Sequence, residues 1–201
     1  MVSMLIACNK DSFKPINKII PEKILDEIAK QIPLYEGNTP PTLEGDYVIS
    51  PCYLLYSSFS TESMDSLPDY SFTLSLQKKK DSTNFIKFVG DNKLLRIDSC
   101  ENACLVGSGS NFTAYYSIKG QHYSGITYKA ALILSGTKSS EGLKNCYLVL
   151  VLLNKSVGTS DTLLMPEGSF RIINDGDNVV KYKDTSTTKS CRELQKSFLQ
   201  R

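Results

Sequence analysis

His122 is the only histidine among the 201 residues, so any mechanism that needs an imidazole base depends on it. Residues 119–122 lie between two strand-like runs and predict a hairpin turn, where side chains are exposed. We therefore interpret His122 as a surface residue. The glycine- and serine-rich residues 107–110 lack the lysine and the following helix of a phosphate-binding loop. Because no nucleophile, base or metal ligands converge in this pattern, we expect neither an enzyme nor a cofactor.

A thiol with a chemical role of its own is predicted near the start of the chain. Residues 5–8 read Leu-Ile-Ala-Cys, a short apolar run with a small residue before Cys8. This run resembles the lipobox of bacterial lipoproteins, in which the cysteine is lipidated and becomes the mature N-terminus. The resemblance implies that Cys8 is lipidated and that residues 1–7 are the remnant of a signal peptide. No Lys or Arg precedes Cys8, so we expect the true start of the signal upstream. A frayed strand with a buried cysteine is the alternative.

A polar stretch without hydrophobic periodicity follows this cysteine. We interpret residues 8–20 as a lipidated tether that spaces a folded domain from a bilayer. The lipid anchor would make a membrane the partner and would place the protein at the bacterial outer membrane or cell surface. Residues 9–11, Asn-Lys-Asp, resemble the charged cluster that marks surface display in some Gram-negative lineages. The periplasmic and the outward-facing leaflet both stay open.

The other cysteines allow two interpretations. With Cys8 lipidated, an odd number remains, so at least one thiol has no disulfide partner. The remaining residues are Cys52, Cys100, Cys104, Cys146 and Cys191. Cys100 and Cys104 bracket three residues, and either a disulfide across a three-residue hairpin loop or two free thiols fit this spacing. No zinc-ligand spacing is present, and the oxygen-rich residues 174–178 lack the downstream Glu of an EF-hand loop. We expect no metal.

The overall charge argues against a nucleic-acid partner. Lys and Arg number 23 against 21 for Asp and Glu, a formal net charge of +2, whereas nucleic-acid binding needs a concentrated basic face. The one charge run, residues 78–80, is interpreted as a solvated hairpin tip. Hydrophobic residues make up 41% and charged residues 22%, the balance of an ordinary globular protein. We interpret residues 21–201 as a single domain.

One amphipathic helix is predicted at the start of this domain. Pro21 suits a first helical turn, and Pro33 ends the element. Between them, apolar residues recur at helical spacing on one face: Ile24, Leu25, Ile28 and Ile32. We expect this face to pack against the outside or an open end of a β-structure.

From Gly45 onward the pattern is that of strands. Phe72 and Leu74 alternate with polar residues, as in a half-buried strand. Turn residues at 90–92, 119–122 and 175–177 predict three hairpins. Consecutive hairpins without crossover helices give an antiparallel meander, and closing it removes its edges. We expect a mainly β fold, an up-and-down barrel of about eight to ten strands with one N-terminal helix. A two-sheet β-sandwich is the alternative.

Three stretches carry a family resemblance. They are PPTLEGDYVISPCYLLYSS, YKAALILSGTKSSEGLKNCYLVLVLL and MPEGSFRIINDGDN. They resemble lipocalin-like (calycin-type) lipoproteins of Gram-negative envelopes, in which a Pro-Pro–Gly–Tyr entry leads to the first strand and a Ser-Gly-Thr turn separates two long strands. A Gly-x-Phe-Arg strand then ends in an Asp-Gly-Asp turn. The resemblance covers roughly residues 20–182 and implies a lipocalin-like barrel in the cell envelope, without catalytic residues.

Two functions are compatible with this barrel. In the first, it binds a small apolar or amphipathic ligand in its mouth. Tyr47, Tyr53, Tyr115 and Tyr128 are the candidate ligand-binding residues, because a phenol offers an apolar ring and an orienting hydroxyl. In the second, side chains fill the core, and the lipoprotein is an accessory or scaffold that acts through contacts with an unidentified protein partner. The tyrosines are then ordinary core residues.

Overall fold

The computed structural model describes residues 19–59, 66–67, 69–76, 86–92, 95–122, 125–156 and 164–183. Several predictions concern residues outside these ranges: the lipobox at Cys8, most of the tether, the lysine run at 78–80 and Cys191. They stay predictions.

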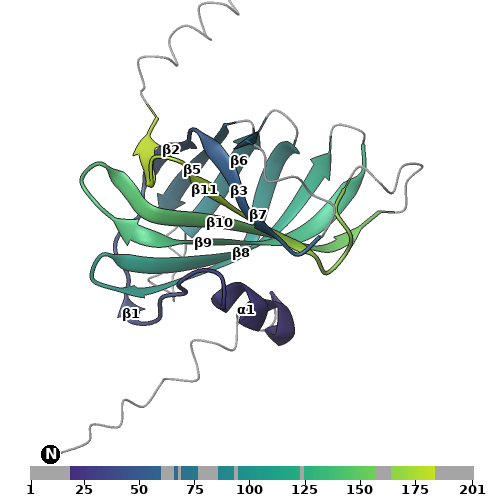
Figure 1. The fold of residues 1–201 in the computed structure, drawn as a ribbon, viewed down its shortest axis with the longest axis horizontal. Coiled ribbons are helices and arrows are strands. Elements are labelled where there is room, and N and C mark those ends of the chain that lie inside the picture. The colour runs from purple at the N-terminus through teal and green to yellow at the C-terminus, as the bar shows by residue number, and fades with distance from the viewer. Residues whose placement is uncertain are drawn as a thin grey trace, which may run out of the picture.

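The described residues form one helix and twelve strands (Figure 1). The helix is α1 (Glu22–Ala29). The strands are β1 (Asn38–Thr39), β2 (Gly45–Ile49), β3 (Cys52–Ser57), β4 (Ser66–Leu67), β5 (Tyr70–Leu76), β6 (Ile86–Asn92), β7 (Leu95–Ser108), β8 (Asn111–His122), β9 (Thr127–Lys138), β10 (Gly142–Lys155), β11 (Phe170–Asp175) and β12 (Val179–Tyr182). The prediction of a mainly β fold with one N-terminal helix is confirmed.

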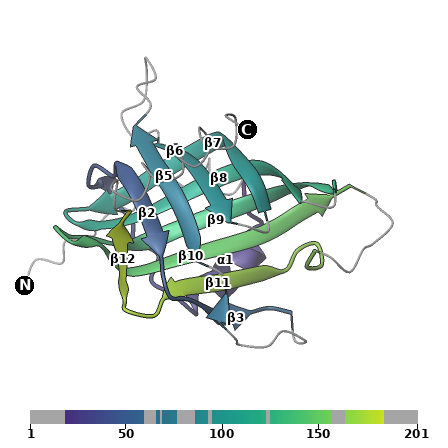
Figure 2. The same cartoon turned by 90° about the horizontal axis from the view of Figure 1, so that it is seen from above.

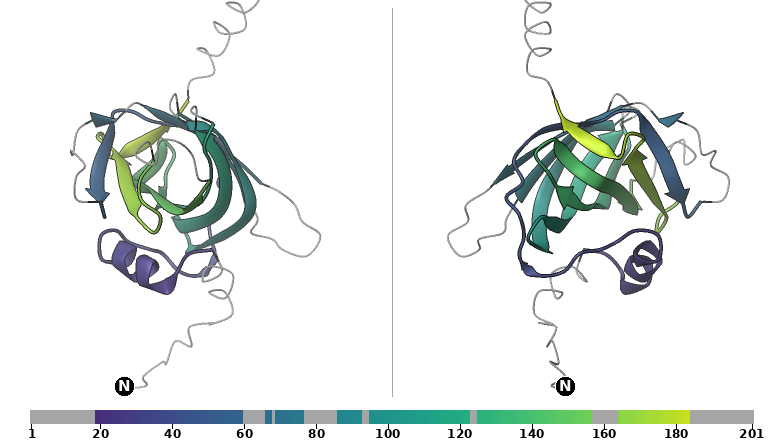
Figure 3. Two further views of the ribbon diagram at one scale, coloured as in Figure 1. Left: turned by 90° about the vertical axis from the view of Figure 1, so that its right-hand side faces the viewer. Right: turned by 60° about the vertical axis from the view of Figure 1, so that its left-hand side comes forward.

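The strands pair in a single curled sheet. Its order is β12-β2-β5-β6-β7-β8-β9-β10-β11-β3-β4, with antiparallel neighbours, and β1 pairs in parallel with β7. Strand β12 also pairs with β10, so the pairings return to their starting point. Viewed along the axis of the sheet, the strands surround a common interior (Figure 3).

Several short strands are parts of longer ones. Gly45 of β2 pairs with Leu74 of β5, and further along Cys52 of β3 pairs with Leu67 of β4 in the same register. Strands β2 and β3 therefore form one side of a hairpin, and β4 and β5 form the other. Likewise β11 and β12 pair with successive parts of β10, Tyr147 to Val151 and Gly142 to Lys144, and the chain turns between them (Figure 2). Eight long strands thus follow one another around the sheet in chain order.

One predicted turn is wrong. Residues 119–122 belong to β8, and Gln121 pairs with Thr127, the first residue of β9. The β8–β9 ladder runs without a register shift from Asn111, which pairs with Thr137, to this end. Each added pair supplies ladder hydrogen bonds, and these outweigh the turn preference of Gly120. His122 accordingly lies in a strand, opposite Leu95.

The predicted hairpin at residues 175–177 is also wrong, because β11 and β12 pair with successive parts of β10 and not with each other. The Asp175 carboxylate explains the local shape of the chain. Its Oδ2 accepts a hydrogen bond from Ser50 N at 2.8 Å, and its Oδ1 accepts one from Asp177 N at 2.8 Å. Gly176 N donates to Pro51 O at 2.8 Å. The turn is therefore short and is held by hydrogen bonds to Ser50 and Pro51, the residues that join β2 and β3.

The disulfide across a hairpin loop is excluded as well. Cys100 and Cys104 both lie in β7, with no loop between them. Four residues of extended strand span about 13 Å, well beyond the Cα separation of a disulfide. Cys104 has a free thiol, as do Cys52 and Cys146.

Two hydrophobic clusters lie on the two faces of the sheet. The outer cluster combines α1 with the sheet face that it covers: Ile20, Leu25, Ile28, Ile32, Val106, Tyr115, Ala131, Ile133, Val149, Val151, Phe170 and Ile172. Because α1 lies outside the ring of strands (Figure 3), the other cluster faces inward. This inner cluster comprises Leu43, Tyr47, Ile49, Cys52, Tyr70, Phe72, Leu74, Ile86, Phe88, Leu105, Phe112, Ala114, Tyr116, Ile118, Tyr128, Ala130, Leu132, Leu134, Leu143, Cys146, Leu148, Leu152, Met165 and Val180.

Helix α1 packs as the sequence predicts. Leu25 and Ile28 are its buried residues, and Ile32 beyond its end is also buried. They cover the outer face of strands β7 to β11. Among the described residues, no helix has the length and apolar character required to cross a bilayer.

Candidate functional site

The four candidate tyrosines do not meet at one site. Tyr47 and Tyr128 belong to the inner cluster, Tyr115 to the outer cluster beneath α1, and Tyr53 is 43% exposed on β3. Tyr53 and Tyr115 therefore do not face the interior in which a ligand of the barrel would lie. Successive residues of a strand face opposite sides, so the inward position next to Tyr115 belongs to Tyr116. The sequence alternation was visible, but it did not say which parity faces the interior.

A row of aromatic rings in contact crosses the interior. Ring centroids are 5.0 Å apart for Tyr182–Tyr47 and 5.3 Å for Tyr47–Phe72. The row continues through Phe88, 5.5 Å from Phe72, to Tyr116, 5.2 Å from Phe88. These separations are typical of favourable aromatic pairs, so rings from β12 to β8 support one another. Burial, and then Tyr182, raise the pKa of Tyr47 above its ordinary value.

The buried residues beside this row are in close contact, whereas Leu150 and Ile173 on the same face are only partly buried. Phe88 and Tyr116 are 0% exposed and Leu132 is 1% exposed, and each buried side chain of the inner cluster is at most 6% exposed. A side chain that bordered a cavity wide enough for water would retain accessible area. The described inner cluster therefore packs side chain against side chain, as in an ordinary protein core.

Two thiols and a carboxylate occur together at the inner face. Asp175 is opposite Cys52 in the β11–β3 ladder, and its negative charge also acts on the thiol of Cys146. Burial, followed by Asp69 and Asp175, raises the pKa of Cys52 to about 11, and burial and Asp175 also raise the pKa of Cys146. Thiols held in the neutral form are poor nucleophiles.

No metal site emerges in the described part of the chain. It holds no group of three or more His, Cys, Asp or Glu side chains that could bind a metal ion. In the oxygen-rich segment 174–178, both oxygens of Asp175 accept backbone hydrogen bonds and Asp177 pairs with Lys181 at 3.0 Å. These carboxylates stabilise the turn.

Arg171 is an inward-facing charge that the sequence interpretation did not assign to a site. Its neighbours Phe170 and Ile172 belong to the outer cluster, so alternation directs Arg171 to the interior. It pairs with Leu150, which packs against the inner cluster. Burial lowers the pKa of its guanidinium. The sequence signal for this position was an arginine between two apolar residues of a predicted strand.

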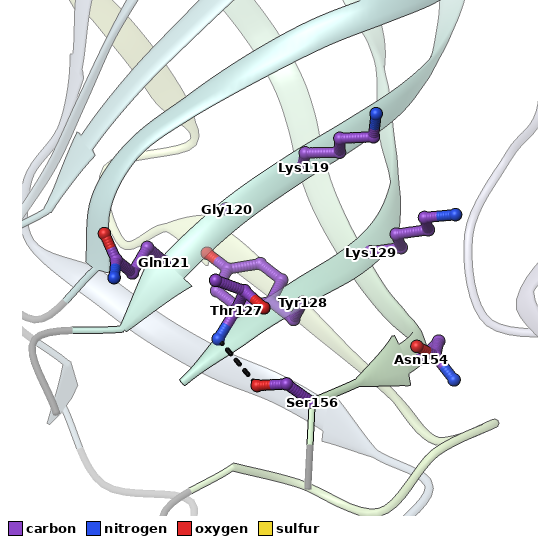
Figure 4. A pocket seen from close by; sticks show the side chains of 8 residues that line it. All are labelled: Lys119, Gly120, Gln121, Thr127, Tyr128, Lys129, Asn154 and Ser156. Atoms are coloured by element: carbon purple, nitrogen blue, oxygen red, sulfur yellow. Dashed lines mark hydrogen bonds between the residues drawn. The ribbon is translucent and has the colours of Figure 1, made fainter. Parts of the chain in front are cut away.

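A polar pocket lies where β8 ends and β9 begins (Figure 4). Its volume is about 400 Å³, and it is open to solvent. Two rows of side chains cross β8, β9 and β10: Lys119, Lys129 and Asn154 in one, and Gln121, Thr127 and Ser156 in the other. Gly120 and Tyr128 complete the lining. Tyr128 is thus the one candidate tyrosine at this pocket.

The two rows of side chains are on the outer face of the sheet, whereas the side chain of Tyr128 belongs to the inner cluster. Lys129 lies two residues before Ala131, a member of the outer cluster, and therefore faces the same side. Lys119 pairs directly with Lys129, and Figure 4 shows the two side chains extending in a similar direction. The hydroxyl of Ser156 accepts a hydrogen bond from Thr127 N at 3.1 Å.

Compared with known proteins, the chain matches no family model, and no curated protein or solved structure is significantly similar to it.

Proposed function

We propose that the protein is a lipid-anchored lipoprotein of the bacterial outer membrane or cell surface, with a lipocalin-like up-and-down barrel that is filled and acts through its outer surface. The eight long strands in chain order, with β12 between β10 and β2, favour such a barrel over a two-sheet sandwich. The acylated residue is Cys8.

The observation that carries this proposal is the packed interior. Barrels of eight strands are narrow, and side chains either fill them or leave room for one small ligand. The row of contacting rings from Tyr182 to Tyr116 and the buried aliphatic residues around it favour the first case. An enclosed apolar ligand would have to displace rings that already contact each other. The accessory or scaffold function is therefore the better supported of the two.

Ligand binding provides the direct test of the filled barrel. The full chain is mixed with a set of fatty acids and small apolar compounds, and its melting temperature is recorded. A ligand that binds the native state must raise this temperature. We expect no shift. A shift that the Phe88→Leu variant enlarges or abolishes, while the exposed Lys87→Gln variant leaves it intact, would place a ligand inside and overturn the proposal.

The membrane anchor requires a separate test. Residues 9–21 can span up to roughly 40 Å when extended, which leaves α1 free to stay on the sheet while Cys8 is in a bilayer. With the natural full signal present, Cys8→Ser should move the protein to the soluble fraction. Membrane retention of Cys8→Ser together with palmitate incorporation would contradict lipidation at Cys8.

A second function, binding of an amphipathic acid, is favoured by one observation. Arg171 faces the interior from β11, and an inward guanidinium suits a carboxylate head group. In this case long-chain fatty acids should raise the melting temperature and the corresponding alcohols should not. Arg171→Gln should remove the shift. Equal shifts by acids and alcohols would argue against this function.

A further inference from the structure

We propose that the outer face of β3 around Tyr53 and Leu55 is a contact surface for a second copy of this chain, related to the first by a two-fold axis. The inference deepens the proposed surface function, because it names the partner, and it rests on that function for its membrane setting. The contact itself requires only the folded sheet.

Two large apolar side chains lie exposed close together on β3. Tyr53 is 43% exposed and Leu55 is 40% exposed. Tyr182 is the third exposed large apolar residue of the described part of the chain, and its ring already stacks on Tyr47. Single apolar residues are common on protein surfaces, whereas neighbouring ones mark contact sites. The pair on β3 is therefore the candidate contact surface.

The exposure of Leu55 results from an irregularity in β3. Its two chain neighbours pair with consecutive residues of β11, Ile173 and Ile172, so Leu55 is the extra residue of a β-bulge. A bulge redirects the side chain of the strand in which it occurs. Leu54 before it is 5% exposed, and Tyr56 after it packs against the outer cluster. The bulge therefore leaves Leu55 uncovered between two covered side chains.

The surface around Tyr53 extends over two further strands. Tyr53 is opposite Asn174 of β11, and Asn174 is opposite Tyr147 of β10. Tyr147 packs against the outer cluster, so the three side chains share the outer face. Directly opposed side chains have Cβ atoms about 5 Å apart, so the three are adjacent. Tyrosine is enriched at protein interfaces, because its ring is apolar and its hydroxyl can form a hydrogen bond.

The ring of Tyr53 packs against the turn that follows β11. A Cβ added at Gly176 would overlap Tyr53 Cε2 and would lie 2.8 Å from Tyr53 Cδ2, so the ring contacts this glycine directly. A ring that is already fixed loses little side-chain entropy when a partner binds. Tyr53 is therefore suited to be a rigid contact residue.

The lack of charge on this surface favours a second copy as the partner. Residues 47–61 contain no Asp, Glu, Lys or Arg, and Asn174 and Tyr147 are also uncharged. A charged partner would lose hydration here without gaining an opposite charge. In a two-fold dimer the same surface of both copies is in contact. An uncharged surface is therefore complementary to itself, since its pairing brings no like charges together.

The size of the surface predicts a weak dimer. A stable interface buries about 800 Å² on each partner, and two exposed side chains with their half-buried neighbours supply only part of this area. Confinement of two copies to one bilayer by the proposed lipid at Cys8 raises their effective concentration, as a linker does. We therefore expect the contact on a membrane, and in solution only at high protein concentration.

The test is sedimentation equilibrium of the unlipidated full chain at increasing concentration, where we expect a monomer–dimer equilibrium. Leu55→Lys places two like charges near the two-fold axis and should raise the dimer Kd at least about tenfold, and Leu55→Glu should do the same. An equimolar mixture of these two variants pairs opposite charges. It should restore a Kd within about threefold of that of the unchanged chain.

Ser75→Lys is the matched control, because Ser75 is an exposed strand residue on β5, outside this surface. It should leave the Kd within about twofold. Urea unfolding of each variant shows that the fold is retained. The proposal is overturned by an unchanged chain that is monomeric at every concentration, by Leu55 variants that behave like the control, or by a mixture that stays monomeric. Such a failure leaves the filled barrel and the anchor at Cys8 untouched, since the apolar-ligand screen and the fractionation test them independently.

Discussion

The inner and the outer clusters share the same strands but are held together in different ways. In the inner cluster, each aromatic ring contacts the next along a row contributed by β12, β2, β5, β6 and β8. The strands of the sheet are therefore held together by side chains that they contribute themselves. The outer cluster is largely aliphatic and is covered by α1. A cavity in the inner cluster should therefore destabilise the whole sheet. A cavity in the outer cluster should mainly weaken the packing of α1 against the sheet. The difference can be tested by substitution.

The largest effect is expected from Phe72→Ala. Phe72 is 2% exposed and stacks on both Tyr47 and Phe88, so its removal leaves a cavity and separates two rings. We expect a loss of about 3–5 kcal/mol in the free energy of unfolding, measured in urea. Phe72→Leu should cost clearly less. A loss below about 1 kcal/mol for the alanine variant would show that the interior is not packed as described.

A smaller effect is expected from Ile28→Ala on the outer face. Ile28 is fully buried between α1 and the sheet, but the helix can shift to reduce the cavity. We expect a loss of about 2 kcal/mol. Hydrogen exchange should accelerate in α1 and not in β5 or β6. Lys23→Ala, at an exposed position of the same helix, should change stability by less than about 0.5 kcal/mol. Equal acceleration in helix and strands would remove the distinction between the clusters.

Gly90→Ala tests how tightly the inner rings are packed. A Cβ at this position would overlap Tyr70 Oη and lie 2.7 Å from a ring carbon of Phe88. The hydroxyl is the far end of its side chain and can move, so we expect a loss of only about 1–2 kcal/mol. Tyr70→Phe should recover part of this loss when combined with Gly90→Ala. Additive losses in the double variant would contradict the contact.

The smallest expected effect is a pH dependence from the inner thiol Cys52. Burial raises its folded-state pKa from the ordinary 9 to about 11, so folding favours the neutral form. Its contribution to stability is complete below pH 9 and is lost as the pH rises towards 11. At pH 10 the loss should be about 1 kcal/mol. Urea unfolding between pH 7 and 10 should show a shallower decline for Cys52→Ala. An unchanged slope would mean that Cys52 is accessible to solvent.

The comparison also shows which features could be predicted from the sequence. The apolar spacing of residues 24–32 predicted α1 and its buried face correctly, and the alternation around Phe72 predicted a half-buried strand. The turn preference at 119–122 predicted the β8–β9 hairpin correctly but placed its turn too early, and the preference at 175–177 predicted a hairpin that does not form. In the first segment the β8–β9 ladder continues through the predicted turn, and in the second the Asp175 carboxylate bonds the turn to Ser50, which is distant in sequence.

The polar pocket had no signal in the linear sequence. Lys119 and Lys129 are separated by a turn, and their direct pairing depends on the register of β8 against β9. Register is set by the whole ladder and not by the residues at its end. The same holds for Asn154, which reaches the pocket through the register of β10.

Local residue order was enough to specify the helix, the strands and the antiparallel meander, because helical and strand periodicities are properties of neighbouring residues. It could not say that Tyr116 faces inward and Tyr115 outward. Strands β8 to β10 carry apolar residues on both faces, because the inner cluster packs against one face and α1 against the other. An alternation of two residues therefore does not tell which face points inward. The closure of the sheet and the docking of α1 broke that symmetry, and they decided the positions of the candidate tyrosines.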